Sequence, residues 1–275
     1  MLAPAGRARC ATKRQQHQPQ AGWHVAEWAC EFVGTTILVL GGLSAVVLDF
    51  GAGSPVTPTL PSHGARLLVT GLLFAGCGSL VAVSPLGRRS GAHLNPAVTL
   101  AFWCQRHVRL ADLGGYVVSQ CLGALVGTAV LRLSWGERAA SVRFGATLPG
   151  RDLGPWPAAG VEALMTAALV FTIFAFVSSP RTTRWTPLAV WIVIAVFVWQ
   201  GAPYTGTSLN PARSLGPAVV GEHWTDYWVY VVGPLGGALS AVALWALVPR
   251  TTLTAKLFHD PSYRSALGSA LPVHC

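Results

Sequence analysis

The chain has 275 residues, of which 52% are hydrophobic and 11% are charged, whereas about 25% of residues are charged in an ordinary soluble domain. So few charges cannot cover a water-facing surface, which argues against most soluble classes and favours a membrane protein. The net charge of +9 could attract nucleic acid to a soluble protein. Here the charges lie in short connections between apolar runs, which suits membrane orientation and indicates no nucleic-acid partner.

Six segments approximate the ~20 mostly apolar residues that a spanning helix needs, which predicts an all-α membrane protein with six transmembrane helices. We expect residues 28–249 to form the membrane domain, between cytoplasmic tails at residues 1–27, basic and disordered, and 250–275. The predicted spans are Trp28–Leu48, Ala65–Pro85, Leu113–Leu133, Pro157–Ser178, Thr186–Trp199 (short, extending to about Gly201) and Trp228–Val248.

Lys and Arg are unevenly distributed between the two sides of this bundle. If the N-terminus is cytoplasmic, 13 of the 19 basic residues lie in the tails and in the second and fourth connections, on the cytoplasmic side. The positive-inside bias therefore predicts a multi-pass protein with both termini in the cytoplasm. We expect it in the cell (plasma) membrane.

Two connections are themselves apolar, yet too short to span the bilayer. They are Ser90–Trp103 (SGAHLNPAVTLAFW) and Gly206–Val220 (GTSLNPARSLGPAVV), and each contains Leu-Asn-Pro-Ala. The two copies are three spans apart, so they enter from opposite faces of the membrane. This spacing predicts an inverted internal repeat, with repeat 1 at about residues 28–135 and repeat 2 at about residues 155–249.

Each repeat also has a glutamate early in its first span, Glu31 in one and Glu162 in the other. A carboxylate at membrane depth is costly and normally faces the protein interior, where it has a partner. The alternative is that each glutamate reaches the headgroups, but their equivalent places in the two halves favour an internal role. We expect them to support the two Leu-Asn-Pro-Ala loops.

Asn-Pro is a strong helix start, because asparagine caps a helix and proline needs no N–H at the first helical position. Each motif should therefore open a re-entrant half-helix, and the two N-termini should meet near the midplane. Two positive dipole ends and two amide donors at one point would hold a water oxygen and oppose cations and protons. The motif residues are Asn95, Pro96, Ala97, Asn210, Pro211 and Ala212.

The segments SGAHLNPAVT and YTGTSLNPARSLG closely resemble the signature loops of the aquaporin, or major intrinsic protein, family. The resemblance extends from about Trp28 to Pro249. It implies six spans plus two half-helices around a pore for water and small neutral solutes, and a homotetramer in the lipid bilayer with one pore per subunit. It implies no cofactor and no enzymatic activity, and no metal-ligand cluster stands out in the sequence.

The resemblance also implies a second constriction, which contains the arginine after the second motif, Arg213. Counting from the motifs places Ala75, Val198 and Thr207 at its other three positions. Water-selective members have an aromatic ring and a histidine where this chain has Ala75 and Val198. The two small side chains should widen the opening and remove one hydrogen-bond donor.

Three transport hypotheses follow from this mixed pattern. Ser214 and Ala218 resemble the water-channel subgroup, whereas the wide filter resembles facilitators of glycerol or of boric, silicic or arsenous acid. An ion-coupled transporter is a third hypothesis, because inverted repeats and broken helices also occur there. His93 beside the first motif could suggest catalysis, but no nucleophile or metal ligand accompanies it. We interpret it as a residue that packs the re-entrant loop.

Overall fold

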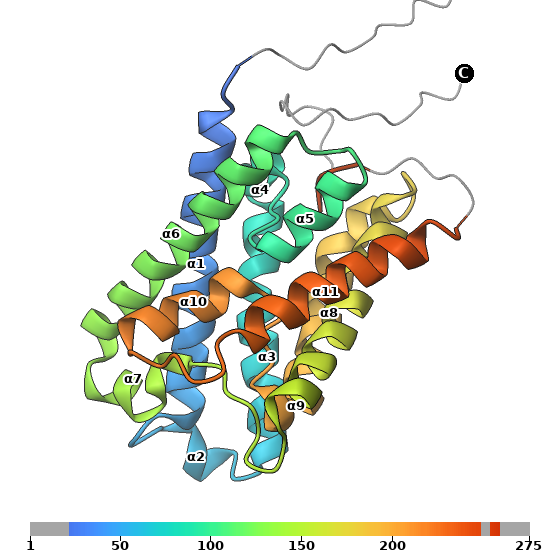
Figure 1. The fold of residues 1–275 in the computed structure, drawn as a ribbon. Coiled ribbons are helices and arrows are strands. Elements are labelled where there is room, and N and C mark those ends of the chain that lie inside the picture. The colour runs from blue at the N-terminus through green and yellow to red at the C-terminus, as the bar shows by residue number, and fades with distance from the viewer. Residues whose placement is uncertain (1–21, 249–253, 259–275) are drawn as a thin grey trace, which may run out of the picture.

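The computed structural model describes residues 22–248 and 254–258, and all regular structure within them is helical. Figure 1 shows long helices packed side by side as one bundle. The long helices are α1 (Val25–Phe50), α3 (His63–Val83), α6 (Leu110–Trp135), α8 (Pro155–Val177), α9 (Thr186–Thr205) and α11 (Val229–Trp245). The shorter elements are α2 (Val56–Thr59), α4 (Pro85–Ser90), α5 (Pro96–Cys104), α7 (Glu137–Ser141), α10 (Pro211–Val220), η1 (Arg143–Gly145) and η2 (Thr183–Trp185).

Five of the six predicted spans are long and apolar enough to cross a membrane: α1, α3, α6, α8 and the segment Thr183–Thr205, which contains α9. The sixth, α11, is apolar but has 17 residues, or about 26 Å of helix. The predicted span Trp228–Val248 was therefore too long at both ends. The all-α membrane fold itself is confirmed.

The bounds of two other spans also differ from the sequence prediction. The first helix begins at Val25, inside the stretch that we expected to be tail. The fifth does not end at about Gly201 but continues to Thr205, and stops at Gly206, whose φ of 74° is left-handed. Glycine is the residue that adopts this conformation most readily at a helix end.

The two short helices α5 and α10 exchange partners between the repeats. Helix α5 packs against α11, the last span of repeat 2, and α10 packs against α6, the last span of repeat 1. Figure 1 shows α4 and α5 toward the end of the bundle where α1 begins, with α2 and α7 at the opposite end. This cross-packing fixes both half-helices inside the bundle.

Glycines bring the first and last spans of each repeat into close contact. A Cβ atom on Gly123 of α6 would lie 2.4 Å from the Phe32 carbonyl oxygen of α1. A Cβ atom on Gly237 of α11 would lie 2.2 Å from the Ala163 carbonyl oxygen of α8. Small residues allow such backbone contact between membrane helices, and it occurs at the equivalent helix pair of each repeat.

Candidate functional site

The asparagine of each motif caps the half-helix that follows it. The Asn95 Oδ1 accepts a hydrogen bond from the Ala97 N–H at 2.9 Å. The Asn210 Oδ1 accepts from the N–H groups of Ala212 at 3.0 Å and Arg213 at 3.3 Å. A proline occupies the first turn of both helices. The local sequence therefore forms the two helix starts that it predicts.

The two motifs also bond directly to each other. The Asn95 Nδ2 donates to the Leu209 carbonyl, and the Asn210 Nδ2 donates to the Leu94 carbonyl, both at 2.8 Å. These reciprocal bonds bring the two half-helix starts together. A side-chain amide nitrogen carries two hydrogens, so each asparagine keeps one N–H beyond this bond.

Glu31 holds the first loop from behind. Its Oε1 accepts from the Ser90 hydroxyl at 2.7 Å and the His93 N–H at 3.1 Å. Its Oε2 accepts from the Leu94 N–H at 2.7 Å and the Gln120 Nε2 at 2.8 Å. Four donors thus satisfy a carboxylate that is completely buried.

Glu162 makes the equivalent bonds in the second loop. Its Oε1 accepts from the Thr205 hydroxyl at 2.7 Å and the Ser208 N–H at 2.8 Å, and its Oε2 accepts from the Leu209 N–H at 2.8 Å. Like Glu31, Glu162 thus accepts from one hydroxyl and from two consecutive backbone N–H groups. The inverted repeat is therefore present at the level of single hydrogen bonds.

These bonds also determine where the loop carbonyls point. In a trans peptide the C=O of one residue points away from the N–H of the next. Because the N–H groups of the residues after them face the glutamates, the carbonyls of Ala92, His93, Thr207 and Ser208 point the other way. All four residues line a cavity that neither glutamate lines. The two loops therefore present a row of acceptors to that cavity.

The cavity has a volume of about 240 Å³ and runs between the two repeats. It is lined by the two loops and by apolar side chains of the long helices, such as Leu169, Ile173 and Ile194. The two motif asparagines and the four predicted filter residues all line it: Ala75, Asn95, Val198, Thr207, Asn210 and Arg213.

Arg213 lies at this cavity and is 5% exposed. Its Nη1 donates to the Gly145 carbonyl at 2.8 Å, and its guanidinium carbon lies 5.4 Å from the centre of the Phe74 ring. The sequence analysis missed both neighbours. Phe74 is adjacent to the counted position Ala75 and also lines the cavity, so an aromatic ring stands beside the arginine after all.

Of the remaining predicted residues, His93 lines the cavity and the others do not. The Ser214 hydroxyl bonds the Ser208 hydroxyl at 2.6 Å and that of Thr147 at 2.8 Å. The His93 ring stacks on Phe102, with centroids 4.8 Å apart. These contacts link the loops to the bundle. The motif residues Pro96, Ala97, Pro211, Ala212 and the subgroup marker Ala218 are buried.

Comparisons with known proteins agree with this geometry. The model of the family "Major intrinsic protein" matches residues 21–245. Aquaporin-4 of Mus musculus is 37% identical over 231 residues, which cover 82% of this chain and 69% of that protein. The lens fiber major intrinsic protein of Gallus gallus is 37% identical over 217 residues, covering 77% of this chain and 80% of that protein.

The fold also matches a solved structure, that of the aquaglyceroporin from Plasmodium falciparum. The match has a TM-score of 0.67 at 22% identity and covers 82% of this chain and 96% of the other. This match shows the fold, whereas the family model and the identity of the curated relatives show the family. The chain belongs to the major intrinsic protein, or aquaporin, family of membrane channels.

Proposed function

We propose that this channel passes water together with small uncharged solutes, and excludes ions and protons. The observation that carries the proposal is the meeting of both motif asparagines and Arg213 at one cavity. The lining of that cavity combines hydrogen-bond donors and acceptors from the two loops and Arg213 with apolar side chains from the long helices.

Proton exclusion follows from the capped half-helices. Two helix N-termini direct positive partial charge at the asparagines, and Arg213 adds a full charge, so a cation meets an unfavourable field. A water oxygen that accepts from both asparagine N–H groups has used its two lone pairs. It cannot then accept a proton from the next water in the file.

The identity of the solute depends on the filter. Phe74 places an aromatic ring beside Arg213, but Ala75 and Val198 keep the rest of the filter wall small. We propose that this leaves room beside Arg213 and Thr207 for a branched hydroxylated molecule such as glycerol or boric acid. Its hydroxyls can bond to the arginine while its remaining surface contacts the apolar wall. A facilitator that carries mainly such solutes, with water as a minor cargo, is therefore the second candidate function.

A flux comparison in proteoliposomes distinguishes the two. The variant Ala75→Phe with Val198→His should lower the ratio of glycerol or boric acid permeability to water permeability, because it narrows the opening. Leu72→Phe, on the same helix but exposed on the bundle exterior, is the matched control and should leave the ratio unchanged. If the wild type excludes both solutes, the wide-filter proposal is wrong and a water channel remains.

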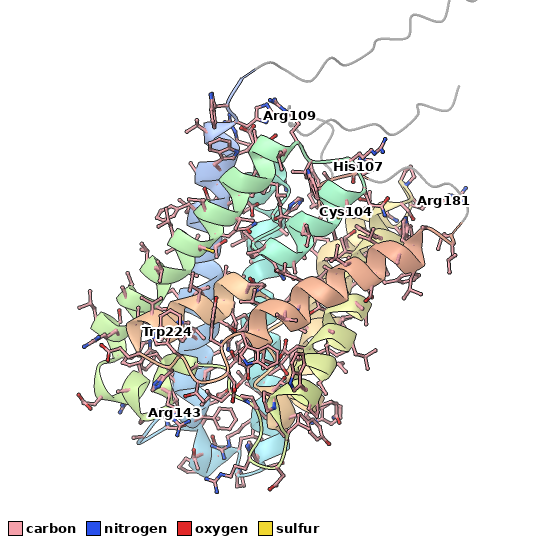
Figure 2. The ribbon with its side chains drawn as sticks, viewed as in Figure 1. Cys104, His107, Arg109, Arg143, Arg181 and Trp224 are labelled. Atoms are coloured by element: carbon pink, nitrogen blue, oxygen red, sulfur yellow. The ribbon has the colours of Figure 1, made fainter. Side chains whose placement is uncertain are left out.

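We also propose a homotetramer with cytoplasmic termini. Exposed apolar side chains on the outer faces of α3, α6 and α9, such as Leu80, Leu133 and Ile192, suit contact with lipid or with neighbouring subunits. Figure 2 shows Arg109 and Arg181 toward the end where α1 begins and Arg143 toward the other, in keeping with the charge bias. Light scattering in mild detergent would test the mass, and labelling of terminal tags on intact cells the orientation.

A further inference from the structure

Five residues that follow α11 in the chain, Thr254–Phe258, lie against the first re-entrant loop. The Leu257 N–H donates to the Gly91 carbonyl at 3.0 Å. The Lys256 Nζ donates to the Arg88 carbonyl at 3.0 Å. The sequence analysis assigned this segment to the tail at residues 250–275, outside the membrane domain. In the structure it is part of the channel.

The burial of the segment is as deep as that of the bundle interior. Residues Thr254 to Leu257 are between 1% and 6% exposed. Gly91 is shaped to receive them: its φ is +96°, and a Cβ atom there would lie 2.4 Å from the Ala255 carbonyl oxygen. Phe258 lies 5.3 Å from the Arg88 guanidinium carbon. Both backbone atoms and side chains of the first loop region therefore contact the C-terminal segment.

His93 makes this docking specific to one repeat. Its Nε2 is 3.1 Å from the Ala255 carbonyl oxygen. Because a carbonyl can only accept, this nitrogen carries the proton, and Nδ1 faces the Thr99 hydroxyl at 3.2 Å. In the second repeat the equivalent residue is Ser208, which bonds to Ser214 within its own loop. The longer histidine side chain is what reaches the C-terminal segment.

Leu257 is also one of the residues that line the cavity, together with Ala92, Leu94 and Val98 of the first repeat. Leu257 packs against the loop that precedes Asn95. In the second repeat, the corresponding loop is the one that contains Thr207. An isobutyl side chain at this place offers no hydrogen bond and reduces the free cross-section. Its effect on a passing molecule is therefore one of size.

From these contacts we infer that the C-terminal segment Thr254–Phe258 completes the pore wall at the first-repeat end, and that Leu257 is a size-determining residue there. The inference rests on the proposed function, because it needs solute flux through this cavity. It adds a constriction on the side of the asparagines away from Arg213. The same segment, held by a few hydrogen bonds, controls how wide that end is.

The test is chemical modification of Leu257→Cys in proteoliposomes. The purified variant is labelled with a bulky methanethiosulfonate reagent, the adduct is confirmed by mass spectrometry, and water and glycerol fluxes are measured. The wild type receives the same treatment to account for its native thiols. Labelled Leu257→Cys should lose water flux several-fold relative to the unlabelled variant, while the wild type changes little.

Leu247→Cys is the matched control, because Leu247 is 82% exposed, lies before the segment and does not line the cavity. Its adduct should leave water flux nearly unchanged. Unchanged flux in labelled Leu257→Cys, or an equal loss in labelled Leu247→Cys, would overturn the inference. Leu257→Ala should in addition raise the glycerol-to-water ratio, and an unaltered ratio would count against size selection. If unlabelled protein of every kind fails to conduct, the proposed function fails instead.

Discussion

At the scale of single residues, Arg213 carries the strongest functional argument. Its partners in the structure, the Gly145 carbonyl and the Phe74 ring, are both neutral. These two contacts orient the guanidinium and bring no charge of their own. The arginine can therefore act as an electrostatic barrier to cations and as a donor to neutral solutes at the same time.

Arg213→Val should remove this barrier and allow protons or small cations to leak. The measurement is membrane conductance in cells that express the variant at the same surface level as the wild type. Arg132→Val is the control, because Arg132 bonds the Val220 carbonyl and does not line the cavity. Conductance equal to that of the wild type would show that Arg213 is not the barrier.

Thr207→Cys should make the channel sensitive to mercurials. Thr207 lines the cavity, so a metal bound to a thiol there would obstruct it. Cys30, Cys77, Cys104 and Cys121, the described cysteines, do not line it, and the wild type should be blocked weakly. Water flux before and after mercury treatment is the measurement. Strong block of the wild type would mean that a native thiol reaches the pore.

The sequence predicted those site residues whose position depends on nearby residues. Asn95 and Asn210 follow from helix capping, which involves only the next few residues. Phe74, Gly145 and Leu257 could not be found that way. Whether Phe74 or Ala75 turns toward the pore depends on the rotation of α3, and the Gly145 carbonyl reaches Arg213 through the path of a long connection. Such features are set by tertiary packing.

At the scale of elements, the two loops owe their shape to buried glutamates. Ala92, Leu94, Thr207 and Leu209 all have positive φ values between 51° and 57°, a conformation that side chains with a Cβ atom rarely adopt. Strained backbone persists when its surroundings over-determine it. The bonds from the loop N–H groups to Glu31 and Glu162 supply that restraint.

Glu162→Gln should therefore destabilise the second loop. A glutamine offers one acceptor oxygen and places an NH₂ group against the donors of Ser208 or Leu209, and an unsatisfied buried group costs about 1–3 kcal/mol. We expect a lower apparent unfolding temperature in detergent and reduced water flux. Glu222→Gln, at an exposed glutamate, is the control. Equal unfolding temperatures for Glu162→Gln and the wild type would contradict the supporting role.

Element types were more predictable than element bounds. The apolar runs and the paired Asn-Pro motifs indicated the six spans and both half-helices, since each signal is local. The fifth span was predicted to extend only to about Gly201. The helix in fact continues through Pro203 to Thr205, because packing inside the bundle tolerates residues that weaken an isolated helix.

At the scale of the whole molecule, the inverted repeat creates the pore. Each half-helix packs against the last span of the other repeat, and each asparagine bonds to a carbonyl of the other loop. Neither repeat could form the meeting point by itself. The two loops differ in two respects. Arg213 follows the motif of the second loop, whereas His93 of the first loop contacts the C-terminal segment.

The most direct test is to measure water permeability and proton permeability in the same wild-type proteoliposomes. Shrinkage after an osmotic step reports water, and an internal pH dye under an imposed proton gradient reports protons. Two opposed half-helices with Arg213 predict water permeability several-fold above that of empty liposomes, with proton permeability no higher than theirs. Water permeability equal to that of empty liposomes, or proton flux that rises together with it, would contradict this account.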